Sequence, residues 1–510
     1  MIMLFFAKTL KNKTMFNTIT MVKKDTQRAL VLQGGGALGA YEAGVFRVLY
    51  NWIKKDIPDD QNVFDIVAGT SIGAINAAFL VSHVIKKRKE ENRNVRESWE
   101  GSAEGLEEFW KSRLASNINL STWWPFCWYQ KWWTCAWDML NKANSDIATG
   151  EAARRYYSSK EFIIKGTPDI FLPHISPNID CKFFDNFIFP NIWYRYDNSR
   201  LKETINKSIN FPIATSFDKK EPRLIATSVD VEEGETVSFD SYVKERDNSA
   251  RRSEYGDFKP GFNDKKGTYE RIIKYDKGIM IEHIMASASV PEHYDYTLVP
   301  KDYDYTKTEE KSIAIRENDL NNYIRFWDGG ILNNTPLREL IQSHRDYWKY
   351  VEWRSDDIPN LEVYIIDVWP SLHGRPVPLD LDGVRNRKNE LTYLDKTPYD
   401  EKIANIVSDY YNFVKAFMQL AEGKGATQEE IDAILNTPSK SSHRTGLRRK
   451  YRDLVEKRFD ITKVIRIERS VDRDDIANKW CDFSLDTITT LFNQGIKDAQ
   501  KTLLLQADGE

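Results

Sequence analysis

Near its start, the chain combines short apolar runs with stretches in which apolar residues recur at helical spacing. Residues 28–33 and 63–68 are apolar runs of strand length. Apolar side chains over 40–52 follow a helical period, and 74–84 is strongly apolar, which is typical of a buried helix. Two strand–loop–helix units in series predict a parallel sheet with helices on its faces, and therefore an α/β fold.

The same pattern predicts further strands and helices in the second half of the chain. The expected strands are 224–229, 236–239, 361–368 and 463–467, and the expected helices are 402–420 and 484–505. Residues 86–105 are rich in charge and are expected to be solvated. The pattern changes near residue 380. We therefore predict an N-terminal arm over 1–26, an α/β domain over 27–380 and a mainly helical extension over 381–510.

The composition is that of a globular protein and argues against several functional classes. The 510 residues are enough for roughly two to three domain-sized units. Hydrophobic residues make up 41% and charged residues 29%. The net charge of −3 gives no support for nucleic-acid binding, which would require a basic face. The four cysteines form no CxxC pair and no metal-ligand spacing with histidine, so we expect a reduced compartment.

The first apolar stretch, over residues 1–7, is too short for a secretory signal or a membrane-spanning helix. We therefore expect a cytoplasmic protein, with contact to membranes at most peripheral. Residues 121–140, STWWPFCWYQKWWTCAWDML, hold six of the fifteen tryptophans. A helix here would gather them on one broad side. We favour packing of that side on protein, because an exposed patch of this kind invites aggregation. Docking to a membrane interface is the alternative, since tryptophan favours that environment.

The loop after the first expected strand carries glycines at a spacing with two interpretations. Gly34, Gly36 and Gly39 satisfy GxGxxG between an apolar run and a helical pattern, which is the context of a dinucleotide-binding loop. The same small residues could instead direct backbone N–H groups toward an oxyanion. A dinucleotide site also predicts an acidic residue at the end of the second strand. That strand ends at Ala68 and Gly69 and leads into a serine, which favours the oxyanion.

The second strand runs into Gly69-Thr70-Ser71-Ile72-Gly73, a GxSxG sequence at an expected strand-to-helix turn. A serine at such a turn is forced toward positive φ, and its hydroxyl is lifted clear of the sheet. Gly69 and Gly73 lack the Cβ atoms that would clash where the chain folds back. The positive end of the following helix favours an anion beside the serine. The sequence therefore predicts Ser71 as a nucleophile, with a tight turn containing an incidental serine as the alternative.

A nucleophilic serine requires a base, and none of the seven histidines lies in the context expected of one. His293 is the least implausible of them. Asp328 instead follows an apolar run and precedes Gly329 and Gly330, which allow the backbone to approach closely. A partly desolvated carboxylate can accept the serine proton directly. Asp-Gly-Gly by itself favours an ordinary β-turn, so the assignment of Asp328 depends on the other motifs.

Three motifs, LVLQGGGALGAYEAGV, VAGTSIGAINAA and FWDGGILNNTPL, occur in this order, each at the end of an expected strand. Together they resemble the patatin-like phospholipase family, over roughly residues 28–370. Residues 225–231 and 285–291 resemble further segments of that family, and the part after 360 resembles the extension of some microbial members. The resemblance implies a three-layer α/β/α fold with a central, mostly parallel sheet, and a serine–aspartate dyad without histidine.

The activity implied by the resemblance is hydrolysis of fatty-acyl esters of phospholipids or related lipids, without a metal or cofactor. Ser71 would attack the ester carbonyl, Asp328 would activate Ser71, and water would hydrolyse the acyl-enzyme. The candidate oxyanion donors are backbone N–H groups of Gly34, Gly35, Gly36 and Ala37. An acyltransferase or thioesterase would share the first half-reaction, and a catalytically idle, lipid-binding scaffold is a further alternative.

Overall fold

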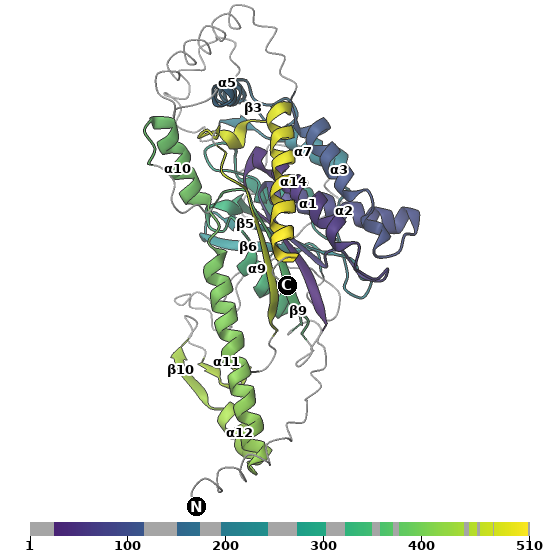
Figure 1. Ribbon diagram of the computed structural model, residues 1–510, viewed down its shortest axis with the longest axis vertical. Helices are drawn as coiled ribbons and strands as arrows, with labels where there is room; N and C mark the ends of the chain where they lie inside the picture. Colours follow the sequence, from purple (N-terminus) through teal and green to yellow (C-terminus); the bar gives the residue numbers. More distant parts are fainter. Residues whose placement is uncertain are drawn as a thin grey trace, which may run out of the picture.

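An eight-stranded sheet forms the centre of the molecule, and helices flank it (Figure 1). The structure is a computed structural model. It describes residues 25–116, 150–173, 195–242, 273–301, 322–348, 358–370, 377–442, 448–455, 459–472 and 474–507. The strand order is β12-β9-β1-β2-β5-β8-β7, with β6 paired to β5.

Five neighbouring strands of this sheet run parallel: β12 (Ile461–Glu468), β9 (Asn360–Asp367), β1 (Thr26–Leu32), β2 (Ile66–Thr70) and β5 (Arg223–Asp230). The other three are antiparallel to their neighbours: β6 (Glu235–Asp240), β7 (Thr297–Pro300) and β8 (Tyr323–Asp328). The prediction of a mostly parallel sheet is therefore confirmed.

Both faces of the sheet are covered by helices. Alternate side chains of a strand point to opposite faces, so a single strand packs against both helical layers. Leu30 and Leu32 of β1 pack with the helices α1 (Gly39–Ile53), α2 (Ile72–Glu91) and α14 (Leu485–Ala507). Ala29 and Val31 of the same strand pack in a separate cluster with α9 (Leu337–Asp346). The chain therefore has the three-layer α/β/α arrangement that was expected.

The remaining elements are short or lie outside these layers. They are η1 (Gly36–Leu38), η2 (Glu97–Trp99), α3 (Ser102–Glu108), η3 (Phe109–Leu114), α5 (Gly150–Lys165), β3 (Leu172–Pro173), β4 (Tyr196–Asp197), α7 (Ser199–Ser208), α8 (Ile281–Ser287), η6 (Gly329–Ile331), α10 (Leu381–Tyr393), α11 (Thr397–Gly423), α12 (Gln428–Leu435), β10 (Pro438–Ser442), β11 (Arg448–Lys450), α13 (Arg452–Val455) and η8 (Lys479–Cys481). No helix among the described segments is long and apolar enough to cross a membrane.

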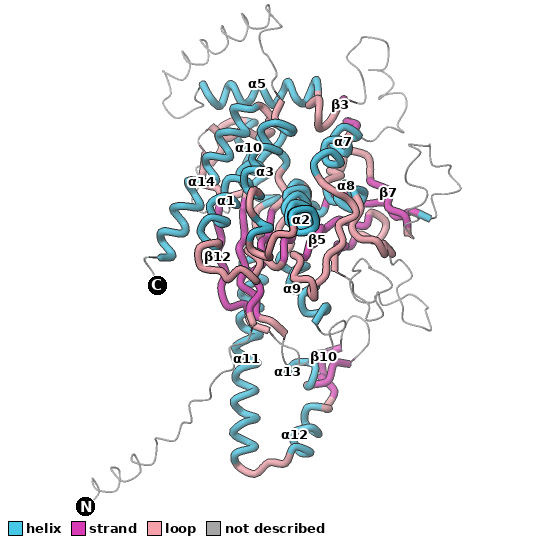
Figure 2. The backbone as a smooth tube through the Cα atoms, turned by 90° about the vertical axis from the view of Figure 1, so that its right-hand side faces the viewer, coloured by secondary structure: helices cyan, strands magenta, loops and turns pink. Residues whose placement is uncertain are grey.

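The segment after residue 380 is mainly helical, as expected, but its parts lie in different places. The helices α11 and α12 extend away from the sheet (Figure 2). By contrast, β12 pairs with β9, and α14 crosses α1 so closely that a Cβ on Gly495 would lie 2.2 Å from the carbonyl oxygen of Tyr41. The sheet therefore takes strands from both sides of the expected boundary near residue 380.

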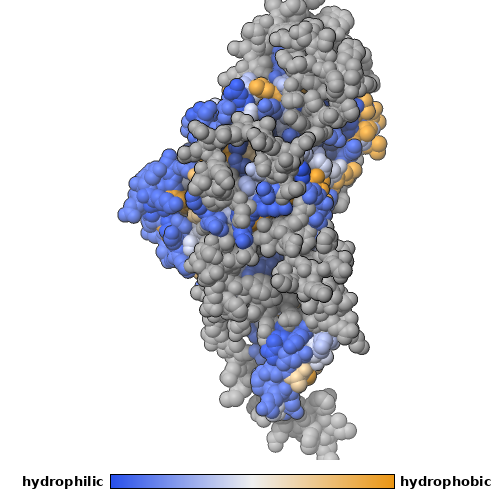
Figure 3. Space-filling view, turned by 180° about the vertical axis from the view of Figure 1, so that it is seen from behind, coloured by the Kyte–Doolittle hydropathy of each residue, from blue (hydrophilic) through white to orange (hydrophobic). Residues whose placement is uncertain are grey.

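Residues 86–105 are only partly as expected. The end of α2 is charged and exposed and belongs to the hydrophilic surface at the left of Figure 3. Trp99, however, is fully buried, and its ring lies 6.1 Å from that of Phe64. The prediction of a solvated segment is wrong there, because Trp99 folds back onto the core beneath the charged residues. The tryptophan-rich run 121–140 and residues 1–24 of the predicted arm lie outside the described residues.

Candidate active site

Ser71 occupies the sharp turn between β2 and α2, with φ 56° and ψ −124°. This confirms the predicted positive φ, an unusual conformation for a residue with a side chain. The flanking glycines make the turn possible: a Cβ on Gly69 would lie 2.2 Å from the carbonyl oxygen of Gly73, and one on Gly73 would lie 2.5 Å from that of Leu32. The backbone N–H of Ser71 donates to Ser287 Oγ at 2.9 Å.

Asp328 meets Ser71 although the two are 257 residues apart in sequence. Ser71 Oγ donates a hydrogen bond to Asp328 Oδ2 at 2.5 Å, and the two residues are only 8% and 4% exposed. The sheet explains the meeting. β5 lies between β2 and β8 and pairs Thr227 with Thr70 and Ser228 with Asp328. The ends of β2 and β8 are thereby brought to the same place.

The environment of Asp328 favours a basic carboxylate. Burial raises its pKa to about 6, against the opposing effect of the hydrogen bonds from Ser71 Oγ and from the backbone N–H of Gly330, the latter at 2.7 Å. At neutral pH the carboxylate is still mostly ionised, yet it holds a proton more readily than an ordinary aspartate. This arrangement can withdraw the hydroxyl proton of Ser71 as the oxygen attacks.

Residues 285–291 connect the backbones of Ser71 and Asp328. Ser287 Oγ accepts from the backbone N–H of Ser71 and donates to the carbonyl oxygen of Thr227 at 2.6 Å. The carbonyl oxygen of Ser289 accepts from the backbone N–H of Asp328 at 2.9 Å. In the sequence this segment was noticed only as a resemblance, and its positioning contacts were not foreseen.

The glycine loop is anchored at Gly34 and open beyond it. The N–H of Gly34 donates to the carbonyl oxygen of Asn334 at 3.2 Å, and its carbonyl accepts from Asn334 Nδ2 and Trp369 Nε1. Gly34 is therefore an anchor, which corrects its place among the candidate oxyanion donors. The N–H groups of Gly35, Gly36 and Ala37 have no hydrogen-bond partner within the described residues, so they are available to an oxyanion.

The side chain of Gln33, which sequence reasoning missed, anchors the start of this loop through hydrogen bonds to neighbouring segments. Its buried side-chain oxygen accepts from the backbone N–H groups of Val368 and Trp369 at 2.8 and 3.0 Å. Its nitrogen donates to Thr335 Oγ1 at 3.0 Å and to the carbonyl oxygen of Tyr393 at 3.1 Å. Both N–H donors and both lone pairs of the amide oxygen are thus used. A polar residue at the end of an apolar strand was the one available signal.

His293, the least implausible histidine, contacts aromatic rings instead of the serine. Its ring lies 4.7 Å from that of Trp480 and 6.1 Å from that of Tyr196, and its Nδ1 is 3.2 Å from the carbonyl oxygen of Pro291. Burial lowers the pKa of His293. In the described part of the chain, the hydroxyl of Ser71 is hydrogen-bonded to Asp328 and not to a histidine.

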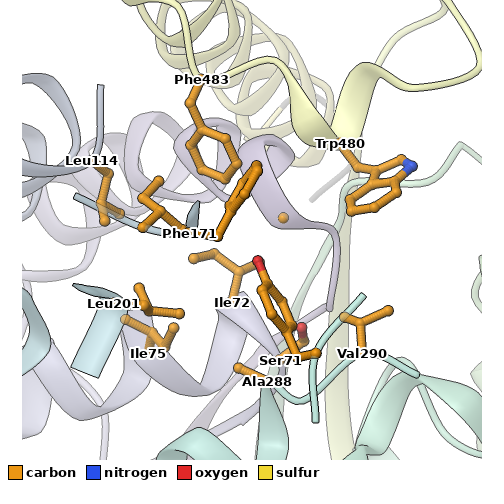
Figure 4. A pocket seen from close by; sticks show the side chains of 13 residues that line it. Ser71, Ile72, Ile75, Leu114, Phe171, Leu201, Ala288, Val290, Trp480 and Phe483 are labelled. Carbon is orange, nitrogen blue, oxygen red and sulfur yellow. The ribbon is translucent and has the colours of Figure 1, made fainter. Parts of the chain in front are cut away.

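A mostly apolar pocket opens beside Ser71 (Figure 4). Its lining comes from widely separated parts of the chain: Gly36, Ser71, Ile72, Ile75, Leu114, Ile170, Phe171, Leu201, Ala288, Val290, Tyr294, Trp480 and Phe483. Gly36 and Ser71 share this pocket, so a carbonyl bound there can reach both. No cluster of three or more potential metal-ligating side chains occurs among the described residues.

Comparison with known proteins identifies the family of the chain. The model of the family described as patatin-like phospholipase matches residues 30–341. The crystal structure of VipD from Legionella pneumophila aligns at 12% identity over 92% of this chain and 67% of that chain. Its TM-score is 0.25, which is too low to support any statement about function. No curated protein matches the chain.

Proposed function

This chain belongs to the patatin-like phospholipase family, and we propose that it is a serine hydrolase of fatty-acyl esters acting through Ser71 and Asp328. Membership of the family supports lipid acyl hydrolysis at a general level. The dyad, the oxyanion donors and the choice of substrate are our proposal. A phospholipid or a related lipid ester is the substrate class that we favour.

The observation that carries the proposal is the hydrogen bond from Ser71 Oγ to Asp328 Oδ2 within a buried site. A structural Ser–Asp contact would require neither a strained φ at the serine nor a carboxylate whose pKa is raised to about 6. Strained backbone and shifted pKa values are costly and occur most often where they serve chemistry. Their combination at one hydrogen bond supports a reactive pair.

In the proposed reaction, Ser71 Oγ attacks the acyl carbon while its proton passes to Asp328 Oδ2. The N–H groups of Gly35, Gly36 and Ala37 stabilise the negative oxygen of the tetrahedral intermediate. Asp328 then returns the proton to the leaving alcohol, and an acyl-enzyme remains on Ser71. Water then attacks this ester while Asp328 accepts its proton, Asp328 passes that proton to the departing Ser71 Oγ, and the fatty acid leaves.

The lining of the pocket supports a fatty-acyl group over a polar one. Side chains such as Ile75, Leu201 and Phe171 offer an apolar surface to the part of the substrate that extends from the acyl carbon. Transfer of apolar surface from water into such a lining is favourable by about 25 cal/mol per Å². The pocket should therefore select chiefly on the acyl group of the ester.

Labelling with a small fluorophosphonate tests the proposal directly. We expect the wild-type protein to gain one covalent adduct, and peptide mass spectrometry to find it on Ser71. Ser71→Ala should abolish the adduct. The matched control is Ser199→Ala, which alters an exposed serine at the start of α7 and should label as the wild type does. Absence of labelling in the wild type, or an adduct that persists in Ser71→Ala, would refute the proposal.

A further inference from the structure

The C-terminal part of the chain reaches into the pocket, well beyond the residues that the family model matches. We propose that residues 474–487 form a fixed wall of the acyl-binding pocket and that Phe483 in this wall limits the length of the bound acyl chain. The substrate class rests on the function proposed above. The position of the wall does not.

Phe483 stands across the cavity from Ser71 (Figure 4). It is 5% exposed, and its ring makes an edge contact with Phe171 at a centroid distance of 6.3 Å. Leu114, which is fully buried, lines the same side of the cavity. An acyl chain that runs from Ser71 into the cavity therefore meets the ring of Phe483, which the C-terminal segment contributes to the boundary together with Trp480.

The wall also touches the glycine loop without any intervening side chain. A Cβ on Gly36 would lie 2.4 Å from the backbone carbonyl oxygen of Trp480. The ring of Trp480, which lines the pocket, also contacts that of His293 at a centroid distance of 4.7 Å. The 3-10 turn η8, which contains Trp480, is thus continuous with the surface that presents the oxyanion donors.

Buried ion pairs hold η8 in this position. Lys479, directly before Trp480, is 3% exposed, and its Nζ donates to Glu390 Oε1 at 3.1 Å and to Asp475 Oδ2 at 2.7 Å. Arg469 pairs with the same carboxylate of Asp475 at 2.5 Å. Buried charges are strongly destabilising when they lose their partners, so these groups hold the segment to one arrangement.

A second set of contacts fixes the residues around Phe483. Its carbonyl oxygen accepts from the backbone N–H of Ser116 at 2.8 Å, close in sequence to Leu114. Asp482 accepts from Ser158 Oγ on α5 at 2.8 Å and from Thr487 Oγ1 at 2.8 Å. The segment is thus bonded to α10 at the start of η8, and to Ser116 and α5 just after its end. Because it is held on both sides, it forms a wall and not a lid that opens.

A fixed wall of this kind predicts chain-length selection. Each additional methylene group that fits into an apolar site is worth about 0.8 kcal/mol, or about fourfold in binding. A chain too long for the cavity must instead displace the ring of Phe483 or leave its end in water. Replacing this ring by a methyl group should therefore benefit long chains much more than short ones.

The test is a series of p-nitrophenyl esters from butyrate to palmitate, hydrolysed by the full-length protein. For Phe483→Ala we expect the ratio of kcat/KM for long over short esters to rise about tenfold or more, since room for two further methylene groups is already worth about sixteenfold. Phe483→Leu, a milder change that is easier to fold, should give a smaller rise. Leu504→Ala is the matched control, because Leu504 lies on α14 and is 67% exposed. It should leave the ratio unchanged.

Fluorophosphonate labelling of the same variants separates the two proposals. If Ser71 is labelled in every variant but the ester ratio does not move, the wall proposal is wrong and the proposed function stands. If the wild type is not labelled, the proposed function fails. The wall proposal is then tested by calorimetric measurement of octanoate and laurate binding. A larger laurate-to-octanoate affinity ratio in Phe483→Ala would support it, and an unchanged ratio would overturn it.

Discussion

The two sides of the pocket are built on different physical principles. On one side, Ser71 and the loop at Gly36 present their reactive groups through backbone conformations that need glycine neighbours or positive φ. On the other side, Trp480 and Phe483 present apolar side chains on a segment held by buried ion pairs. The first side depends on atomic positions in the backbone, whereas the second depends on side-chain volume. Substitutions on the first side should therefore reduce turnover, and those on the second should change substrate preference.

The largest effect is expected on the reactive side, from Asp328→Asn. The amide has nearly the same shape and can still interact with the N–H of Gly330, but it cannot accept the proton of Ser71. Loss of a general base typically costs about 10²- to 10⁴-fold in kcat, and we expect a loss in this range. The measurement is kcat for a short p-nitrophenyl ester.

Asp380→Asn serves as the control for this change. Asp380 caps α10 by accepting from the backbone N–H of Gly383, and asparagine caps helices about as well. It should keep wild-type turnover. If Asp328→Asn stayed within a few-fold of the wild type, Asp328 would not be the base, and the description of this side as the chemical one would fail.

Gly36→Ala tests the point at which the two sides meet. Gly36 has φ 56°, and an added Cβ would lie 2.4 Å from the carbonyl oxygen of Trp480, so either the loop or the wall must shift. Displacement of an oxyanion donor typically costs about 10²- to 10³-fold in kcat, and we expect an effect of this order with KM changed much less. Steady-state kinetics with one ester series gives both constants.

Gly234→Ala is the control for Gly36→Ala, because it introduces a similar backbone strain without a steric clash. Gly234 has φ 65° in the turn between β5 and β6, and nothing lies within 4 Å of its added Cβ. This variant should lose some stability but keep its kcat. Equal losses of kcat in the two variants would mean that general destabilisation, and not the oxyanion loop, explains the result.

The smallest effect is expected from pH. Burial raises the pKa of Asp328 to about 6, and the carboxylate is a base only when ionised, so kcat/KM should fall as the pH drops below about 6. At pH 5 the loss should be about tenfold relative to the plateau. An ordinary aspartate, with a pKa of about 3.9, would show this tenfold loss only near about pH 3.

The pH profile also separates the two sides. Phe483→Leu should change the preferred ester but leave the midpoint of the profile where the wild type has it, because Phe483 makes no contact with the carboxylate. A midpoint near pH 4 in the wild type would contradict the role given to burial. A midpoint that moved with Phe483→Leu would contradict the separation of chemistry from selection.

Sequence reasoning selected the residues of the proposed dyad because each lies in a short motif whose geometry is local. The positive φ of Ser71 and the need for Gly69 and Gly73 follow from a strand that turns directly into a helix. The choice of Asp328 required three motifs together, since Asp-Gly-Gly by itself is an ordinary turn. The oxyanion roles and the dyad stay proposals, and the geometry is compatible with both.

The positions that were missed or misjudged all depend on contacts between distant parts of the chain. Gly34 was predicted to be an oxyanion donor, yet its N–H donates to the carbonyl oxygen of Asn334, which is 300 residues away in sequence. The side-chain nitrogen of Asn334 in turn donates to the carbonyl oxygen of Gly34. The amide of Gln33 reaches Tyr393 across 360 residues. Trp99 was expected to be solvated among charges but lies in the core. The residues that neighbour these positions in the sequence do not indicate which distant residues they will contact.

By itself, the sequence determined the parallel strands of the sheet, the helices α1, α2 and α14 and the serine turn, because hydrophobic period and glycine placement act over a few residues. Only the tertiary structure decided which N–H groups stay available for an oxyanion and that Trp480 and Phe483 complete the pocket. The physical reason is that periodicity records whether a side chain will be buried, whereas its partner is chosen when the sheet and its helices close around a common core.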